Sequence, residues 1–516
     1  MGNAPSPAVG SDAEEGRSSS VHHQLRPLVD SSRQWGRAIL LVWMCDDPRV
    51  RSDASSAVLW FRRDLRLHDL PALAAALAHE RVAPLFVFDE ALLAGRWRSP
   101  NRVAFLLGSL AVLAEELARR GSRLHLRWGR PVAVVPVFAR EAGASVVYCS
   151  REYSPYGRRR DRAVAAALAA EGRTLTRLPG VLVHEPEAVR KADGSPYTVY
   201  TPFRKSWEQV PRRQPLPAPE RLPPPPPLAA GTLPSLAELG LGTPSPHLPA
   251  PGEVAARQRL QRFLDEGLAL YAERRDLLAV AGTSRLSQDL RWGLLSPLEV
   301  VSRTQASPQF VAELVWREFY YSILFHFPEV VYQEFQARYR RLPWREAPAE
   351  LAAWREGRTG YPLVDAGMRQ LAATGYLHNR ARMVVASFLT KHLLIDWRHG
   401  ERHFMELLVD GDLANNNGGW QWTAGVGTDA APYFRVFNPV AQGQRFDPEG
   451  AYVRQWVPEL RRVPTAYIHQ PWQMPREVQE ASGCHLGRDY PFPLVDLEAG
   501  RARALAAYRL APLEGA

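Results

Sequence analysis

The most informative stretch of this chain is residues 410–442, DGDLANNNGGWQWTAGVGTDAAPYFRVFNPVAQ. It lacks the apolar periodicity of an amphipathic helix or a strand, so the sequence predicts a Gly/Asn-rich loop. Its glycines permit a close backbone approach or a positive φ; they are Gly418, Gly419, Gly425 and Gly427. Asparagine amides beside the indoles of Trp420 and Trp422 suit a planar, nitrogen-rich ligand. A buried loop with core tryptophans is the plainer alternative.

Length and composition indicate a globular protein of more than one domain. The chain has 516 residues, 46% of them apolar, which is too long for a single hydrophobic core. No apolar run reaches the roughly 18 residues that span a bilayer, so we expect no membrane partner and a cytoplasmic location. Three widely separated cysteines argue against a disulfide framework and against a zinc site, so no metal is expected. The net charge of +10 favours an anionic partner, with nucleic acid first.

Residues 54–183 have the pattern of an α/β domain, preceded by a tail at residues 1–53 that we predict to be disordered. Short β-branched or aromatic runs predict strands at 58–61, 82–88, 124–128 and 145–149. Helical runs lie between them at 71–79, 101–120 and 131–141. This alternation predicts a Rossmann-like parallel sheet with helices on both faces.

A charged segment, Arg62 to Asp69, follows the first predicted strand. Open α/β sheets bind ligands at the carboxyl ends of their strands, so this position suits a binding site. The same charges also suit a salt-bridged loop, which the residues by themselves favour. Arg151 to Arg162 forms a second basic patch, for which a solvated helix start is the alternative.

The stretch 184–251 is predicted to be a proline-rich interdomain linker, since Pro211 to Pro251 carries 14 prolines in 41 residues and cannot pack as helix or sheet. From 252 to 516 the apolar period is helical, which predicts an all-α domain. Helices are expected at 253–268, 308–327, 348–356, 363–373, 378–394 and 400–409. A capping box at Ser296 to Glu299 starts another.

The helix predicted at 308–327 carries an unusual polar face. Four of its residues fall at i, i+3, i+4 and i+7, and they are Glu313, Trp316, Arg317 and Tyr320. An acid, an indole, a guanidinium and a phenol in one stripe predict a lined cavity or a partner surface; a solvated face is the alternative. Thr283 to Ser287 adds hydroxyls, backbone amides and one cation, which suit a diphosphate.

Five motifs, in order, resemble those of the photolyase/cryptochrome family. They are LWFRRDLRLHDLPAL at 59–73, TSRLS at 283–287, WREFYY at 316–321, YLHNRARM at 376–383 and DGDLANNNGGWQWTAGVGTDAAPYFRVFNP at 410–439. The resemblance runs from residue 57 to the end and is closest to the class I cyclobutane pyrimidine dimer photolyases. It implies an α/β antenna domain and a helical domain that holds FAD, with a pocket for a flipped-out dimer of UV-damaged DNA.

The resemblance also implies which residues bind the cofactor. Arg382 would pair with Asp410, and Asn416 would face flavin N5. By motif position the cofactor-binding residues are Tyr271, Thr283, Ser284, Arg285, Leu286, Ser287, Arg382, Asp410, Asp412 and Asn416.

The dimer pocket, the electron relay and the DNA contacts follow from the same resemblance. Besides Asn416, the pocket would be lined by Glu313, Trp316, Asn379, Met383 and Trp422. Glu313, if protonated, would donate a hydrogen bond to a thymine carbonyl. Electrons would reach the flavin from the surface through Trp344, Trp397 and Trp420. The DNA would be contacted by Arg275, Trp316, Arg317, Asn379, Arg380 and Gln442.

The implied activity is a light-driven lyase reaction, in which reduced anionic FAD donates an electron to a pyrimidine dimer and the dimer splits. A cryptochrome-type signalling flavoprotein shares the fold and the FAD and is the first alternative. Asn416 and the paired indoles Trp316 and Trp422 favour repair. A non-catalytic nucleic-acid-binding module is the second alternative, and it leaves the TSRLS and Asn/Gly motifs unexplained.

The second chromophore is less well indicated. Folate-binding members of the family carry Asn-Glu where this chain has Tyr156-Gly157. A deazaflavin or a flavin is therefore favoured over folate as an antenna. We expect the protein to act as a monomer.

Overall fold

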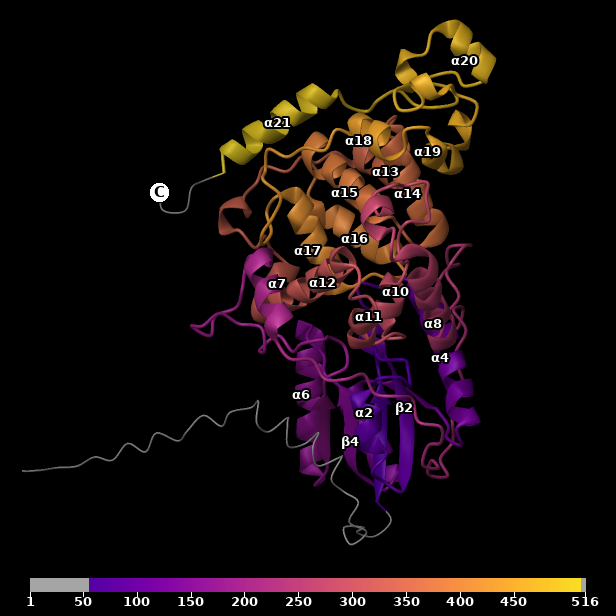
Figure 1. The fold of residues 1–516 in the computed structure, drawn as a ribbon, viewed down its shortest axis with the longest axis vertical. Helices are drawn as coiled ribbons and strands as arrows, with labels where there is room; N and C mark the ends of the chain where they lie inside the picture. Colours follow the sequence, from indigo (N-terminus) through magenta and orange to yellow (C-terminus); the bar gives the residue numbers. More distant parts are fainter. Residues whose placement is uncertain (1–54, 512–516) are drawn as a thin grey trace, which may run out of the picture. The chain divides into compact units, whose positions relative to one another are not determined.

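The computed structural model describes residues 55–511, so the tail predicted at residues 1–53 lies outside the described residues. The first part of the described chain is a parallel sheet of five strands in the order β3-β2-β1-β4-β5 (Figure 1). The strands are β1 (Ser56–Phe61), β2 (Arg81–Asp89), β3 (His125–Gly129), β4 (Ala144–Ser150) and β5 (Thr174–Leu178). The sequence predicted the first four. It missed β5, a half-exposed edge strand whose TLTRL sequence has no apolar run.

Helices cover both faces of the sheet, as the alternation of strands and helices predicted. Successive side chains of a strand point to opposite faces. Leu59 and Phe61 of β1 therefore pack toward α2 (Pro71–Ala76) and α4 (Pro100–Arg119). Val58 and Trp60 pack on the other side. The helices there are α5 (Pro131–Glu141) and α6 (Pro155–Ala170).

The stretch 184–251 contains a helix that the linker prediction missed. This helix, α7 (Tyr200–Gln209), buries Trp207, whose Nε1 donates to Glu318 at 2.7 Å. Beyond it, residues 211–251 contain neither helix nor strand. They are nevertheless attached along their length, because the Leu126 amide of β3 donates to Ala230 and the His247 amide donates to Ala373 of the helical domain.

The helical domain confirms the all-α prediction for residues 252 onward (Figure 1). The Ser296 hydroxyl accepts the Glu299 amide, as the capping box predicted. Within residues 55–511, no helix combines the length and apolarity needed to cross a bilayer. The helices are α8 (Glu253–Arg262), α9 (Tyr271–Arg274), α10 (Ser287–Trp292), α11 (Pro297–Arg303), α12 (Pro308–His326), α13 (Pro348–Glu356), α14 (Pro362–Thr374), α15 (Asn379–Ser387), α16 (Trp397–Leu407), α17 (Leu413–Ala424), α18 (Pro439–Phe446), α19 (Ala451–Trp456), α20 (Arg476–Ser482) and α21 (Leu497–Arg509).

Helix α17 corrects the prediction of a loop at the start of the 410–442 stretch. Its first turn is capped by Asp412, whose carboxylate accepts the Asn415 backbone amide at 3.0 Å. Side-chain amides add polar contacts to its packing, since Gln421 donates to Asn417 at 3.1 Å. At Gly418 a Cβ would overlap the ring of Tyr320 from α12, so glycine permits direct helix packing. Because many of these contacts are polar or involve the backbone, the sequence of α17 shows no clear apolar periodicity.

Candidate active site

A cavity of about 550 Å³ lies within the helical domain, lined chiefly by α12, α15, α17 and the loop before α10. This volume is within the range of small-molecule and cofactor sites. The cavity brings together almost all the residues implied by the resemblance: Tyr271, Arg275, Thr283, Ser284, Arg285, Leu286, Ser287, Glu313, Trp316, Arg317, Asn379, Arg380, Arg382, Met383, Asp410, Asp412, Asn416, Trp420 and Trp422. Trp344, Trp397 and Gln442 lie outside its lining.

One carboxylate of the cavity is Asp410, which is 6% exposed. Arg382 of α15 donates to its Oδ2 at 2.7 Å, so the two residues form the pair that the resemblance implied. Its Oδ1 is buried and has no hydrogen-bond partner within residues 55–511. Because a buried carboxylate oxygen is costly to leave unpaired, this atom marks a place where a ligand can donate.

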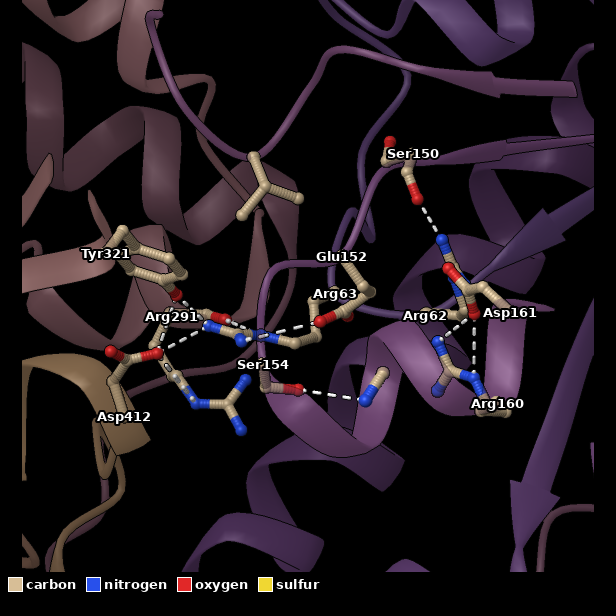
Figure 2. Close-up of polar contacts among 12 residues, drawn as sticks. Arg62, Arg63, Ser150, Glu152, Ser154, Arg160, Asp161, Arg291, Tyr321 and Asp412 are labelled. Carbon is tan, nitrogen blue, oxygen red and sulfur yellow. Dashed lines mark hydrogen bonds and ion pairs between the residues drawn. The ribbon is translucent and has the colours of Figure 1, made fainter. Parts of the chain in front are cut away.

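The second carboxylate, Asp412, is held by more partners. Its Oδ2 accepts from Tyr321 Oη at 2.6 Å and from Arg63 Nη2 at 2.6 Å, as Figure 2 shows. Burial would raise the pKa of Asp412, but the guanidiniums of Arg63 and Arg291 hold it below its ordinary value. Burial and the charge of Arg63 together lower the pKa of Arg291 to about 10. Asp412 is therefore ionised in a cluster with two cations.

Asn416 is oriented by α16, the helix behind it. Its Nδ2 donates to the backbone carbonyl of Glu401 at 3.1 Å, and Nδ2 of Asn417 donates to the Glu401 side chain at 3.1 Å. Burial raises the pKa of Glu401 to about 7, against the opposing effect of the Asn417 hydrogen bond. Two consecutive asparagines are thus anchored on one buried glutamate, and Asn416 lines the cavity.

The Thr283–Ser287 segment forms part of the cavity wall with an unusual backbone. Arg285 has φ of 54°, in the left-handed region that non-glycine residues rarely adopt. Its guanidinium lies 4.0 Å from the ring centroid of Tyr376. Such backbone strain costs on the order of 1–3 kcal/mol and persists mainly at functional sites. The arrangement keeps one cation and several hydroxyls on the cavity wall.

Two indoles lie toward the more exposed side of the cavity, with Asn379 exposed near them and Met383 half-buried. Trp316 is stacked on Tyr200 of α7, with ring centroids 3.7 Å apart and an interplanar angle of 3°. Trp422 is half-buried on α17. The sequence reasoning missed Tyr200 because it lies inside the predicted linker. The helical spacing of Tyr200, Phe203 and Trp207 is the signal that would have revealed α7.

The charges beside these indoles are paired with each other. Arg275 donates to Glu313 at 2.6 Å, and Arg380 lies 3.0 Å from Asp276. Arg275, expected to contact DNA, therefore pairs with Glu313 in this structure, and the roles of both residues stay predictions.

Arg317, also expected to contact DNA, lines the cavity and makes contacts within the protein. Its guanidinium lies 4.9 Å from the ring centroid of Tyr321 and donates to the Val181 carbonyl at 3.1 Å. Its role on DNA stays a prediction. Gln442 lies half-buried on α18, away from the cavity lining.

The three tryptophans of the expected relay belong to one apolar cluster. Trp420 is buried on α17, where Gly400 of α16 leaves room for its ring. Trp397 is fully buried and donates to Glu334 at 3.2 Å. Trp344 is half-buried against the same cluster. This series runs from the cavity wall to a partly exposed residue, and the relay itself stays a prediction.

The unsatisfied groups of the cavity wall match the chemistry of FAD. Buried polar atoms without a hydrogen-bond partner in the described part of the chain include Asp410 Oδ1, Arg291 Nη1, Arg317 Nη1 and Trp420 Nε1. A Cβ at Gly419 would meet no atom within 4 Å, so α17 is open to the cavity there. Carbonyls, ring nitrogens and phosphates of the cofactor would accept from the three donors, and its hydroxyl or N–H groups would donate to Asp410 Oδ1. The residues present therefore fit the cofactor that the resemblance implied.

Comparisons with known proteins agree with this geometry. Residues 57–221 match the family described as DNA photolyase, and residues 310–510 match the FAD binding domain of DNA photolyase. The deoxyribodipyrimidine photo-lyase of Halobacterium salinarum is 41% identical over 485 residues, covering 88% of this chain and 99% of that protein.

Two solved structures are similar throughout the described fold. The class III photolyase of Agrobacterium tumefaciens has a TM-score of 0.83 at 40% identity and covers 90% of this chain and 99% of its own. A cryptochrome of Synechocystis has a TM-score of 0.81 at 32% identity, with coverages of 89% and 100%.

Proposed function

The chain belongs to the DNA photolyase family, and from that premise we propose that it splits cyclobutane pyrimidine dimers in the cavity of its helical domain. It is a deoxyribodipyrimidine photo-lyase, a flavoprotein of light-driven DNA repair. One observation carries the assignment to the cavity. Buried, paired carboxylates and unsatisfied polar atoms line one part of it, and two indoles line a more exposed part.

Reduced FAD, when bound, supplies an electron to the dimer under blue or near-UV light and takes it back after the ring opens. The chain's own residues have to bind the cofactor and the dimer and hold them in position. The hydroxyls of Thr283 to Ser287 and the cation of Arg285 would hold the diphosphate. Asp410 and Asp412 would contact the ribityl chain and the flavin ring. The amide of Asn416, oriented by its bond to Glu401, would face flavin N5.

The indoles of Trp316 and Trp422 would receive the extruded dimer. Stacking on an aromatic side chain is worth on the order of 1–3 kcal/mol per base. Extruding a lesion costs a few kcal/mol, so two indoles are sufficient to offset it. Tyr200 supports the ring of Trp316 from behind, which holds this surface in place before DNA arrives.

The ion pairs beside the indoles would exchange partners on DNA. Phosphates would draw Arg275 from Glu313 and Arg380 from Asp276, and each contact would add about 0.9 to the salt slope of log K. Glu313, freed from its cation, would then be available, if protonated, to donate a hydrogen bond to a dimer carbonyl. On this proposal, the ion pair of Glu313 with Arg275 is the arrangement of the protein without DNA.

Trp344, Trp397 and Trp420 would carry an electron from the surface to the oxidised cofactor. We expect Trp397→Phe to block photoreduction of bound FAD while enzyme that is chemically reduced beforehand keeps nearly full repair. Loss of both would contradict the relay, because the indole is then needed for something other than electron transfer.

The proposal also covers the antenna chromophore of the α/β domain, the oligomeric state and the location of the protein. Gly157 packs on Glu152, where a Cβ would come within 2.9 Å of the Glu152 Cβ, so the glutamate of folate-binding members does not fit this backbone unchanged. This favours a deazaflavin or flavin antenna.

We further propose that the protein acts as a monomer in the cytoplasm.

The test is the absorption spectrum of the purified protein followed by repair assays on cyclobutane and (6-4) substrates, in light and in darkness. We expect a flavin spectrum and light-dependent loss of cyclobutane dimers alone. A flavin spectrum without repair would favour a signalling flavoprotein, the second candidate, to which the similarity with the Synechocystis cryptochrome points. Repair in darkness would contradict both.

A further inference from the structure

The segment Arg62 to Asp69, at the carboxyl end of β1, has no role in the function proposed above. Most of its charged side chains are salt-bridged, as the residues themselves favoured, and these contact different parts of the chain, while Arg66 donates to backbone carbonyls. Arg62 donates to Asp161 of α6 at 2.6 Å, within the α/β domain (Figure 2). His68 lies 2.7 Å from Glu253 of α8, and Asp69 binds Arg213 of the linker.

Arg63 is the member of this segment that reaches the cavity wall. Its Nη2 donates to Asp412 Oδ2 at 2.6 Å and also contacts the hydroxyl of Tyr321 (Figure 2). Its Nε donates to the backbone carbonyl of Arg291 at 3.4 Å. A side chain of the α/β domain therefore contacts three residues of the helical domain at one point.

Asp412 transmits this contact to α17 because its two oxygens have different partners. Oδ2 accepts from Arg63 and Tyr321, while Oδ1 accepts the backbone and side-chain amides of Asn415. The side-chain conformation with which Asp412 caps α17 is thus held by Arg63 of the α/β domain. Helix α17 presents Asn416 and Gly419 to the cavity, so a shift of its first turn would move the cofactor-facing wall.

The same contact also affects the charge of that wall. The guanidiniums of Arg63 and Arg291 lie beside two carboxyl groups, Asp412, with Arg291 Nε 3.9 Å from it, and Glu152, 3.9 Å from Arg63 Nη1. The charges of these four groups balance, so loss of the Arg63 cation alone would leave the cluster with a net negative charge. A buried negative charge disfavours the more negative state of a neighbouring group.

We propose that Arg63 is a positioning residue for the cofactor site, which acts from the α/β domain through Asp412. The inference rests on the proposed function, since it takes FAD as the occupant of the cavity. Arg63 holds the first turn of α17 in place and favours the reduced, anionic form of the bound cofactor. The α/β domain is on this view part of the cofactor site.

The experiment compares Arg63→Gln with Arg63→Lys in the full-length protein. The readouts are the Kd for FAD by fluorescence titration and the midpoint potential of bound FAD. We expect Arg63→Gln to weaken FAD binding about tenfold, as for loss of one charged hydrogen bond, and to lower the midpoint potential. Arg63→Lys should recover most of both, because a single nitrogen of Arg63 makes the contacts to Asp412 and Tyr321.

Arg213→Gln is the matched control, since Arg213 also binds the Arg62–Asp69 segment but contacts no residue of the cavity lining. It should leave the Kd within about twofold of wild type and the midpoint potential unchanged, because distant sites act independently. An equal loss in Arg63→Gln and Arg213→Gln would overturn the proposal, because general attachment of the linker would then explain both.

Tyr321→Phe keeps the test decisive if Arg63→Gln fails to fold. It removes the other donor to Asp412 Oδ2 while leaving both guanidiniums, so FAD binding should weaken by about threefold with the potential little changed. FAD binding equal to wild type in Tyr321→Phe and in Arg63→Gln would overturn the inference. Wild-type protein that takes up no FAD would overturn the proposed function instead, so the two failures are distinguishable.

Discussion

The cavity has two parts, and the ion pairs of one part are more buried than those of the other. In the inner part, made of Arg382, Asp410, Asp412 and Asn416, the two carboxylates are nearly inaccessible and are bound to guanidiniums. At the mouth, the side chains of Glu313 and Asp276 are 31% and 33% exposed and pair with Arg275 and Arg380.

The difference indicates which groups are permanent and which can exchange. Removing one partner of a buried pair leaves an uncompensated charge and is strongly destabilising. Half-exposed pairs contribute little and are screened by salt, so they can separate when a phosphate arrives. The inner part is therefore built for a resident cofactor, and the mouth for a substrate that binds and leaves.

The largest expected effect comes from Asp412→Asn, compared with Asp276→Asn at the mouth. The first leaves Arg63 and Arg291 without a carboxylate and should lower the free energy of unfolding by about 3–5 kcal/mol, with loss of FAD. The second should cost less than about 1 kcal/mol and keep FAD. Urea unfolding and flavin content measure both. Equal effects would remove the distinction between the two parts.

A pH-dependent effect is expected from Glu401→Gln, behind the inner part. Glu401 ordinarily titrates at 4.5, and burial raises its pKa to about 7. The native state therefore holds a proton that the unfolded chain has lost, so wild-type stability falls as pH rises from about 4.5 to 7. The neutral amide does not titrate. Its stability relative to wild type should rise by roughly 3 kcal/mol across that window.

Urea unfolding at pH 4.5, 6 and 8 measures this difference. Glu406→Gln on the same helix is the control, because that side chain is more exposed and its pKa is lowered, chiefly by the hydrogen bond from His403. A difference between Glu401→Gln and wild type that does not change with pH would show that folding does not raise the pKa of Glu401.

At the mouth, Trp316→Ala should reduce the affinity for dimer-containing DNA while leaving FAD bound. Loss of one stacking surface corresponds to about 1–3 kcal/mol, or roughly 10- to 100-fold in Kd. Trp128→Ala is the control, since that indole is exposed on β3 of the α/β domain. Loss of FAD in Trp316→Ala would mean that the mouth and the inner part are not separate.

The smallest expected effect concerns Tyr200, which supports Trp316. An aromatic pair is worth about 0.5–1.5 kcal/mol beyond burial, so Tyr200→Ala should weaken dimer binding roughly 2- to 10-fold. Tyr200→Phe keeps the stacked ring and loses only the hydrogen bond to the Ala312 carbonyl, so it should bind DNA nearly as wild type does. Equilibrium binding of dimer-containing DNA measures both, and equal losses would assign the effect to the hydroxyl.

Two helices show how far sequence patterns extend to the site. The polar stripe of α12 was predicted correctly, because Glu313, Trp316 and Tyr320 share a face wherever that helix is placed. Helix α17 was missed, because amide hydrogen bonds and the close approach at Gly418 stabilise it without an apolar stripe. Apolar periodicity detects burial of apolar side chains, and it does not detect a helix whose buried face also contains asparagine, glutamine and threonine.

The amino-acid sequence alone was enough for the α/β and all-α domains, the motifs of the family and the chemical character of each cavity wall, since these depend on residues close together in the chain. It contained no sign that Arg63 would meet Asp412, 349 positions away, or that Tyr200 would stack on Trp316. Those contacts arise only when separate segments pack, because the partners are chosen by the shape of the folded chain and not by spacing along it.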